Sequence, residues 1–527
     1  MKKIISVLVS IALIFSLSGF ALAEKNNAVI KPVSSLNEEE KAVKSTIEQF
    51  LNRFFQSFVS LEEGNINDIT EDNDSTYTYK MFNKQQIELY KEFGISYQWF
   101  KLNPCYRSIS IKNNQADVKL ILDVNYQLTG VDVESGMYGI NFDFVLNNKN
   151  GIWTISKIDS DYDLFNKFKE NIKNEAKQLI SGSSIKEAVN KAYQKKIDDF
   201  QTMKVQISDA KTEKISKEPS SDVIITATYP YNNSNGVAYA TRFVGGDSTS
   251  VGDSYTLESA HPYTNNYTNT WTISKTGAVS IRVHFSRIST EDGWDYVTTD
   301  AGDEFTGSYD SGVWSSWKQG SSIKVTLNTD SSVTDWGVKI DRIDYRYFYN
   351  TELTSPGTWD CTNFVSQCIW AAYGGYVSGN DTQTRTNISN KVRMVNGTYT
   401  TGWFGGTGGG SGPWENVGCL WTFATNSSKT YGPNATGINN NAYYNNISPS
   451  SVLLGDVLQF YDYDISDYHH SVYVTYKPSS GVTWDNLLVC QHSSDVKNRP
   501  VIELINAFGG SSCKMRRMTF SSASFSS

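Results

Sequence analysis

Apolar residues recur at helical spacing near the start of the chain and alternate with polar residues further on. From Asn37 to Phe58 the apolar positions fall every three or four residues, which predicts an amphipathic helix. Alternating runs separated by Asn-rich turns then predict strands at Ser108–Ile111, Ala116–Leu128, Met137–Leu146 and Trp153–Lys157. A helix followed by an antiparallel sheet predicts an α+β N-terminal module over residues 24–160.

Two further changes of pattern divide the rest of the chain. Residues 161–222 are charged and helical in pattern and end in a polar stretch with Pro219, which predicts a helical linker. Residues 246–347 are rich in Thr, Ser, Gly and aromatic side chains with alternating apolar positions, which is typical of an all-β sandwich. We assign residues 223–245 and 348–527 to a second α+β domain, for reasons given below.

Length and composition fit a multidomain globular protein. A chain of 527 residues is too long for one hydrophobic core, and 39% of its residues are apolar. The net charge is −8 and no Lys/Arg cluster is present, so we expect no nucleic-acid partner. Six cysteines are too few for a disulfide scaffold in a chain of this size.

The N-terminus has the pattern of an export signal. Lys2 and Lys3 precede an apolar run that ends at Phe20, and Ala21-Leu22-Ala23 follows as a small-residue cleavage site. We therefore expect a signal peptide over residues 1–23 and a secreted protein that is extracellular or associated with the cell wall. An uncleaved membrane anchor is the alternative interpretation of this apolar run. No later stretch is apolar enough to span a bilayer, so we expect no stable membrane insertion.

The strongest chemical signal surrounds Cys361. Apolar residues at helical spacing follow it, which places Cys361 in the first turn of a helix with Asp360 as its N-cap. Unpaired amides and the positive dipole end of a helix favour the thiolate over the thiol. The same amides can stabilise an oxyanion. A cysteine in this position is therefore a candidate nucleophile.

A nucleophilic thiol needs a base, and three histidines follow in suitable places. His469 and His470 begin a predicted strand, and His492 ends the next one. Neighbouring strand residues point to opposite faces, so only one of His469 and His470 can face Cys361. The order of cysteine on a helix, histidine on a strand and polar residue on the next strand resembles the papain-like plan as permuted in the NlpC and CHAP families.

The match becomes specific in four segments, which together resemble the putative amidase domain family of exported Gram-positive proteins. They are the octapeptide Asp360–Gln367, Gly455-Asp456-Val457, His470-Ser471-Val472 and Gln491-His492-Ser493. The resemblance implies a papain-like cysteine hydrolase domain at the C-terminus that cuts an amide bond of peptidoglycan or of a peptide, without a cofactor. It implies Cys361 as nucleophile, His470 as general base and His492 as the group that orients His470. Asp495 is the alternative for that third role.

The family usually begins with a helix that bears Tyr-Asn and Ala-x-Tyr-Ala patterns. Here Tyr231-Asn232 and Ala238-Tyr239-Ala240 lie before the predicted sandwich rather than just before Cys361. We therefore expect the sandwich to be inserted into the catalytic domain after its first helix, since insertions are tolerated at exposed loops.

The predicted sandwich resembles the CUB-like family in a series of short segments. They are His261-Pro262-Tyr263, Thr270-Trp271-Thr272-Ile273, Val283-His284-Phe285, Trp294-Asp295-Tyr296, Thr329-Asp330-Ser331 and Trp336-Gly337-Val338. In calcium-binding members, acidic residues at the positions of Glu291, Asp295 and Asp330 hold the ion, and carboxylates are the ligands that calcium prefers. The alternative is that these residues are solvated loop acids.

Other functions fit parts of the same sequence. The chain could be an inactive surface-binding protein that recognises a cell-surface glycan or a protein through the CUB-like region. It could also be a cysteine acyltransferase, because a thioester passes to an amine as well as to water. A zinc site at the cysteines and histidines is disfavoured, because neither Cys-x-x-Cys nor His-Glu-x-x-His is present.

Overall fold

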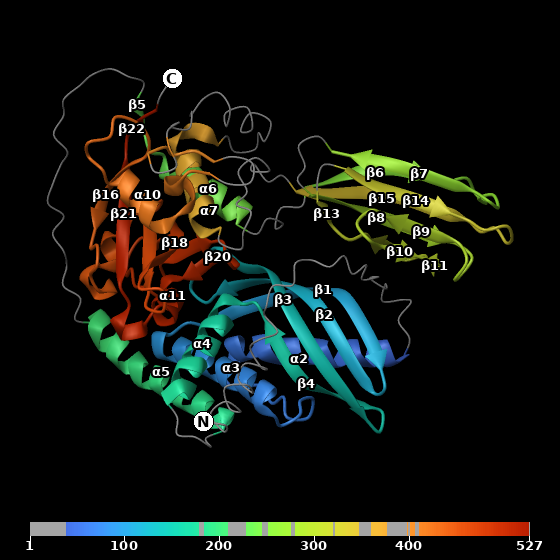
Figure 1. Cartoon of the computed structure of the whole chain (residues 1–527), viewed down its shortest axis with the longest axis horizontal. Coiled ribbons are helices and arrows are strands. Elements are labelled where there is room, and N and C mark those ends of the chain that lie inside the picture. Colours follow the sequence, from blue (N-terminus) through green and yellow to red (C-terminus); the bar gives the residue numbers. More distant parts are fainter. Residues whose placement is uncertain are drawn as a thin grey trace.

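The computed structural model has a mixed α/β architecture with several antiparallel sheets, which agrees with the predicted multidomain α+β class (Figure 1). It describes residues 38–178, 184–208, 228–244, 251–275, 280–319, 322–346, 360–376, 398, 401–405 and 410–525. The predicted signal peptide and the end of the predicted linker, residues 209–222, lie outside the described residues. No helix in the described ranges has both the length and the apolar character needed to cross a membrane.

The N-terminal part packs two helices against an antiparallel sheet. The helices are α2 (Glu38–Ser60) and α3 (Asp74–Phe93), and the strands are β1 (Tyr97–Lys112), β2 (Gln115–Leu128), β3 (Glu134–Lys149) and β4 (Ile152–Ser160). The apolar stripe of α2 is buried, with Phe50 and Ile47 fully inaccessible, because it packs against β1 and β4. The predicted helix and all four predicted strands are therefore present, whereas α3 was not predicted.

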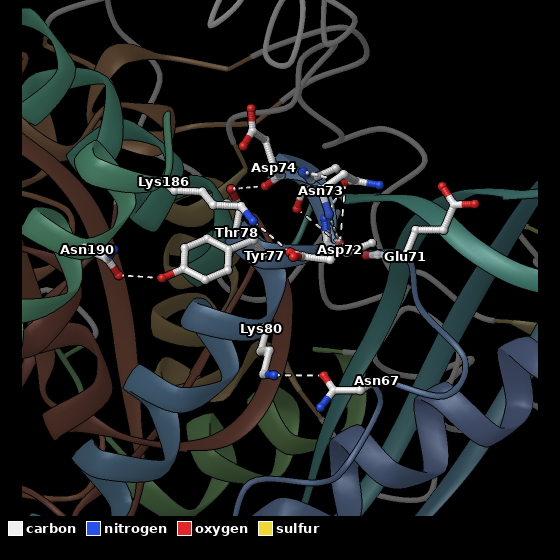
Figure 2. Close-up of polar contacts among 12 residues, drawn as sticks. Asn67, Glu71, Asp72, Asn73, Asp74, Tyr77, Thr78, Lys80, Lys186 and Asn190 are labelled. Atoms are coloured by element: carbon white, nitrogen blue, oxygen red, sulfur yellow. Dashed lines mark hydrogen bonds and ion pairs between the residues drawn. The ribbon is translucent and has the colours of Figure 1, made fainter. Parts of the chain in front are cut away.

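Helix α3 is fixed at its start by a capping box, shown in Figure 2. The side chain of Asn73 accepts hydrogen bonds from the amides of Ser75 and Thr76, and the Thr76 hydroxyl accepts one from the Asn73 amide. Beside it, Lys186 forms an ion pair with Asp72 at 2.7 Å. The ion pair thus joins the start of α3 to the next helical segment.

That helical segment is the predicted linker, and through residue 208 it is a packed part of the fold. It contains α4 (Asp163–Gln178) and α5 (Ile185–Ser208). Phe165, Phe168 and Phe200 are almost fully buried in the same core as α2 and β2. Figure 1 shows both helices beside α3, and α5 also contacts α3 directly.

The N-terminal strands continue into a ten-stranded sheet with strands from the C-terminal part. The added strands are β16 (Asn434–Ile438), β17 (Val457–Asp462), β18 (Asp467–Tyr476), β19 (Leu488–Gln491), β20 (Asp495–Pro500) and β21 (Met515–Ser521). The order is β1-β2-β3-β20-β19-β18-β17-β21-β16, with β4 also paired to β3. Val496 of β20 lies opposite Met137 of β3, so this register joins the two parts of the chain.

A buried polar network reinforces this junction. Arg499 of β20 is fully buried and donates to both carboxylate oxygens of Asp163 in α4, at 2.6 and 2.9 Å. Glu503 of α11 (Val501–Ala507) lies 3.3 Å from Arg499 and accepts a hydrogen bond from the Tyr90 hydroxyl at 2.6 Å. Buried charges are stable only when paired and hydrogen-bonded, so these residues hold the N-terminal helices in one position against the sheet.

Residues 251–346 form two antiparallel sheets around a core of their own. The strands are β6 (Val251–Glu258), β7 (Thr268–Ser274), β8 (Ser280–Ser289), β9 (Tyr296–Thr299), β10 (Glu304–Phe305), β11 (Ser308–Tyr309), β12 (Val313–Trp314), β13 (Lys318–Gln319), β14 (Ser322–Asn328) and β15 (Gly337–Arg346). One sheet runs β10-β9-β14-β7, and the other runs β11-β8-β15-β6 with β12 and β13 also paired to β8. Phe285, Val325 and Ile340 are fully buried between them.

Helix α6 (Asn233–Phe243) packs beside α7 (Cys361–Trp370), although the two-sheet region lies between them in the sequence. The Tyr239 hydroxyl donates to Gln367 Oε1 at 2.9 Å. A β carbon on Gly236 would lie 1.9 Å from the hydroxyl of Tyr473, so the approach of α6 to β18 requires glycine here. Just before α6, β5 (Thr228–Tyr229) pairs with β22 (Ala523–Ser524).

The remaining short elements surround α7 and the sheet. They are the π-helical turn η3 (Ala371–Gly375), helices α9 (Gly412–Glu415) and α10 (Val417–Ala424), and the 3₁₀ turns η4 (Tyr444–Asn446), η5 (Pro449–Ser451) and η6 (Gly510–Ser512).

Candidate active site

Cys361 is the first residue of α7, as predicted, and its sulfur lies against the backbone of β18. Sγ is 3.9 Å from the carbonyl oxygen of His469 and 3.8 Å from Thr362 Oγ1. The Thr362 hydroxyl in turn lies 3.0 Å from the hydroxyl of Ser471. The first turn of α7 therefore contacts β18 at the residues on both sides of His470. Cys361 itself is 5% exposed.

Burial raises the pKa of the Cys361 thiol above its usual value. The amide of Ser471 and the hydroxyl of Thr362 act in the opposite direction, and the negative charge of Asp360 adds to the rise. Burial therefore acts against the thiolate that the first amides of the helix favour.

Asp360 is at the N-cap position of α7, as predicted, but its side chain does not cap the helix. Its Oδ2 lies 2.7 Å from Nδ1 of His492, and its Oδ1 accepts a hydrogen bond from Asn363 at 2.5 Å. The ring of His492 stacks on Phe364 with 4.1 Å between centroids, and its Nε2 lies 3.4 Å from the carbonyl oxygen of Phe243. The structure thus brings His492 together with Asp360 rather than with His470.

The charges around His492 favour its protonated form. Burial acts to lower the pKa of His492, but the negative charges of Asp495 and Asp360 outweigh it and raise the value to about 9. Burial raises the pKa of Asp495 to about 6, and the positive charge of His492 opposes that rise. The group is an ion-paired imidazolium at the start of α7 at neutral pH.

His470 lies on β18 beside the position of Cys361, but its ring turns to the other side of the sheet. The ring stacks against Phe508 with 5.5 Å between the ring centroids, in the core that also buries Phe460. Tyr473 of the same strand instead lies in the core that contains α6 and α7. A register shift contributes to this orientation, because Phe460 pairs with His470 but Tyr461 pairs with Tyr468, which leaves an extra residue in β18. The structure does not bring the ring of His470 to the sulfur.

The surroundings of His470 keep it neutral. Burial lowers the pKa of His470 to about 4, while the charge of Asp163 and the amide of Gln491 act in the opposite direction. Gln491 donates to Asp163 at 3.1 Å, so the network around Arg499 extends to the strand next to His470. Within the described residues, Nε2 of His470 is buried and has no hydrogen-bond partner.

Other side chains beside Cys361 were not identified from the sequence. Val417 and Tyr468 pack directly against Cys361 in a small buried cluster. Arg516 of β21 stacks on the ring of Tyr468, with 3.8 Å between the guanidinium carbon and the ring centroid. The feature of the sequence that could have identified Arg516 is the pair Arg516-Arg517 between two methionines in a strand. Arginines are seldom buried, so their presence in an apolar strand indicates a special role.

Three acidic side chains meet in the two-sheet region at the positions expected for calcium. The ligand atoms of Glu291, Asp295 and Asp330 lie within 4.8 Å of one another, and this is the one such cluster of three found among the residues that the structure describes. Asp295 is fully buried and accepts a hydrogen bond from the Tyr263 hydroxyl at 2.6 Å. Partial burial and the charges of Asp330 and Asp295 raise the pKa of Glu291. One oxygen of Glu291, Oε2, is buried without a hydrogen-bond partner among the described residues, so the residues present fit a hard cation.

The cysteines with described side chains are all free thiols: Cys361, Cys368, Cys419, Cys490 and Cys513. Cys368 shares helix α7 with Cys361, and no disulfide joins them. Cys361 is thus available for chemistry.

One comparison with known proteins found a family match over part of the chain. Residues 333–515 match the family described as a putative amidase domain, a stretch of about a third of the chain that contains Cys361 on α7, His470 on β18 and His492 just after β19. The match supports a hydrolase that acts on amide bonds in general. No curated protein matches the chain.

Proposed function

We propose that this protein is an exported cysteine amidase or peptidase that hydrolyses an amide bond of peptidoglycan or of a peptide. The amidase match supports the reaction class. The single observation that carries the cysteine mechanism is the position of the Cys361 sulfur, which lies at the N-terminus of α7 and against β18 on both sides of His470. The apolar run before Ala21-Leu22-Ala23 supports export to the wall, where an amide substrate is available.

In the proposed reaction, Cys361 attacks the carbonyl carbon of the amide. When substrate binds, β18 rearranges at its extra residue so that the ring of His470 leaves Phe508 and reaches the sulfur, where it takes the thiol proton and gives it to the leaving amine. Catalytic hydrogen bonds are often long or poorly aligned before substrate binds, and the extra residue in β18 is the point at which this strand can change which face His470 occupies. The first amides of α7 stabilise the oxyanion, and water then releases the acyl group from the sulfur.

The ion pair between Asp360 and His492 has a different role in this proposal. It joins the residue before Cys361 to the end of β19, and the stacking of His492 on Phe364 fixes the first turn of α7. His492 therefore positions the nucleophile, and Asp495 keeps His492 charged.

Digestion of purified peptidoglycan tests the proposal. Wild-type protein should release new amino or carboxyl termini that mass spectrometry can read, and Cys361→Ser should release none. Cys368→Ser is the matched control, because Cys368 lies in the same helix, is fully buried and has no proposed role. Equal release by wild type and Cys361→Ser would refute the cysteine mechanism. If wild type transfers the acyl group to added glycine instead of water, the protein is an acyltransferase.

We further propose that Glu291, Asp295 and Asp330 bind calcium and stabilise the two-sheet region. The cluster supplies three carboxylates, and Oε2 of Glu291 has no partner within the described part of the chain. Calcium chloride should raise the unfolding temperature of the wild type but not of Glu291→Gln. Asp341→Asn, which changes an acid paired with His284 on the same region, is the control and should respond like the wild type. An equal response of Glu291→Gln would exclude the site.

A further inference from the structure

Arg516 is a buried cation close to the candidate nucleophile, and no described carboxylate forms an ion pair with it, although the negative charge of Asp467 acts on it from a greater distance. It is 5% exposed and lies between two aromatic rings, with its guanidinium carbon 4.5 Å from the ring centroid of Trp421 and 3.8 Å from that of Tyr468. Other buried arginines have acidic partners: Arg499 pairs with Asp163, and Arg517 lies 3.7 Å from Asp456. Buried cations are normally paired, so Arg516 needs an explanation.

The hydrogen bonds of Arg516 go to neutral acceptors and leave part of the group unused. Its Nε donates to Gln459 at 2.7 Å, one terminal nitrogen donates to Asn440 at 3.0 Å and the other to the carbonyl of Val417 at 3.5 Å. Arginine carries five N–H donors, so these three bonds leave two among the described residues, one on each terminal nitrogen. Two such donors match the two oxygens of a carboxylate.

Two routes connect Arg516 to Cys361. Tyr468 and Val417 each contact both residues. In addition, the Gln459 side chain that accepts from Arg516 donates to Ser471 at 3.1 Å, and Ser471 contacts Thr362 next to the nucleophile. The cation is therefore held in a fixed position one side chain away from the reacting sulfur.

We propose that Arg516 binds a carboxylate of the substrate beside the scissile amide. This inference rests on the proposed amidase function and narrows its substrate to an amide with a free carboxylate nearby. The rings of Trp421 and Tyr468 keep the guanidinium planar and oriented, and the neutral hydrogen bonds position it without neutralising it. The substrate supplies the missing negative charge, so binding also orients the amide toward Cys361.

The test compares native peptidoglycan with the same preparation after its carboxylates are converted to amides by carbodiimide and ammonia. Wild-type protein should release termini from native material roughly 10- to 100-fold faster, which corresponds to loss of one charged hydrogen-bonded contact. Arg516→Gln should lower the rate on native material by a similar factor, so that the ratio of the rates on native and amidated material falls toward one. Arg516→Lys keeps the charge but loses the paired donors, so its preference should be intermediate.

Controls separate this inference from the underlying function. Arg287→Gln removes an arginine of the two-sheet region that stacks on Trp336, and it should keep the wild-type preference. Equal rates of wild type on both preparations would overturn the carboxylate inference while the amidase proposal stands. No release from either preparation would overturn both. If Arg516→Gln does not fold, Arg516→Lys decides, because an unchanged preference in that variant overturns the inference.

Discussion

The ion pair between Asp163 and Arg499 should be the main electrostatic bond between the N-terminal helices and the sheet that bears the candidate active site. Asp163→Asn keeps the shape of the side chain but removes its charge, and it leaves the fully buried guanidinium with Glu503 at 3.3 Å as its remaining acid. Breaking a buried pair costs about 3–5 kcal/mol because an uncompensated charge stays buried. Since Glu503 retains part of the attraction, we expect a loss of about 3 kcal/mol in the free energy of unfolding.

Urea unfolding followed by tryptophan fluorescence measures this loss. Glu175→Gln is the matched control, because it removes a pair with Lys195 whose side chain is 73% exposed, and exposed pairs contribute less than about 1 kcal/mol. The double variant Asp163→Asn, Arg499→Met should recover part of the stability, since it removes the buried charge itself. If Asp163→Asn loses no more stability than Glu175→Gln, the account of the junction is wrong.

Two further predictions concern the histidines and the packing of α6. The pKa of His470 is lowered to about 4, so the stability that neutral His470 contributes is present above the unfolded value near 6.5 and is lost as pH falls toward 4. The pKa of His492 is raised to about 9, so the stability that charged His492 contributes is present below 6.5 and is lost as pH rises through 9. Urea unfolding between pH 4 and pH 9 should show both losses in the free energy of unfolding. His470→Gln should flatten its pH dependence on the acid side, and His492→Gln should flatten it on the alkaline side. Unchanged pH profiles in these variants would contradict the assigned environments. Gly236→Ala should lower the free energy of unfolding by about 1–3 kcal/mol, because the new β carbon meets the hydroxyl of Tyr473. Gly418→Ala, whose β carbon has its nearest contact at 3.5 Å, is the control and should leave the unfolding midpoint nearly unchanged. Equal midpoints for the two variants would contradict this packing.

Much of the fold could be predicted because the local patterns are strong. The helix near Phe50 and the four N-terminal strands follow directly from apolar spacing. Helix α3 was not predicted because its outer face is polar, although the capping box at Asn73 marks its start. The joining of two parts of the chain in one sheet could not be predicted, since the pairing of Val496 with Met137 depends on contacts between segments far apart in the sequence.

The elements that carry the candidate residues could be predicted from the sequence, but the geometry between those residues could not. The place of Cys361 at a helix start follows from the apolar spacing after it. Strand alternation alone could not predict the extra residue in β18 that accompanies the turn of His470 toward Phe508. Nor could it predict that Asp360 would bind His492, because that contact depends on where β19 ends relative to α7.

The central claim is that Cys361 is a nucleophile assisted by His470, and alkylation by a peptidyl chloromethyl ketone, a reagent that occupies the substrate site, tests it most directly. Labelling rates at each cysteine, read by peptide mass spectrometry, should show Cys361 reacting faster than the more exposed Cys419. His470→Ala should slow labelling of Cys361 by at least about tenfold, and His469→Ala should not. Faster labelling of Cys419, with no effect of His470→Ala on Cys361, would contradict the account.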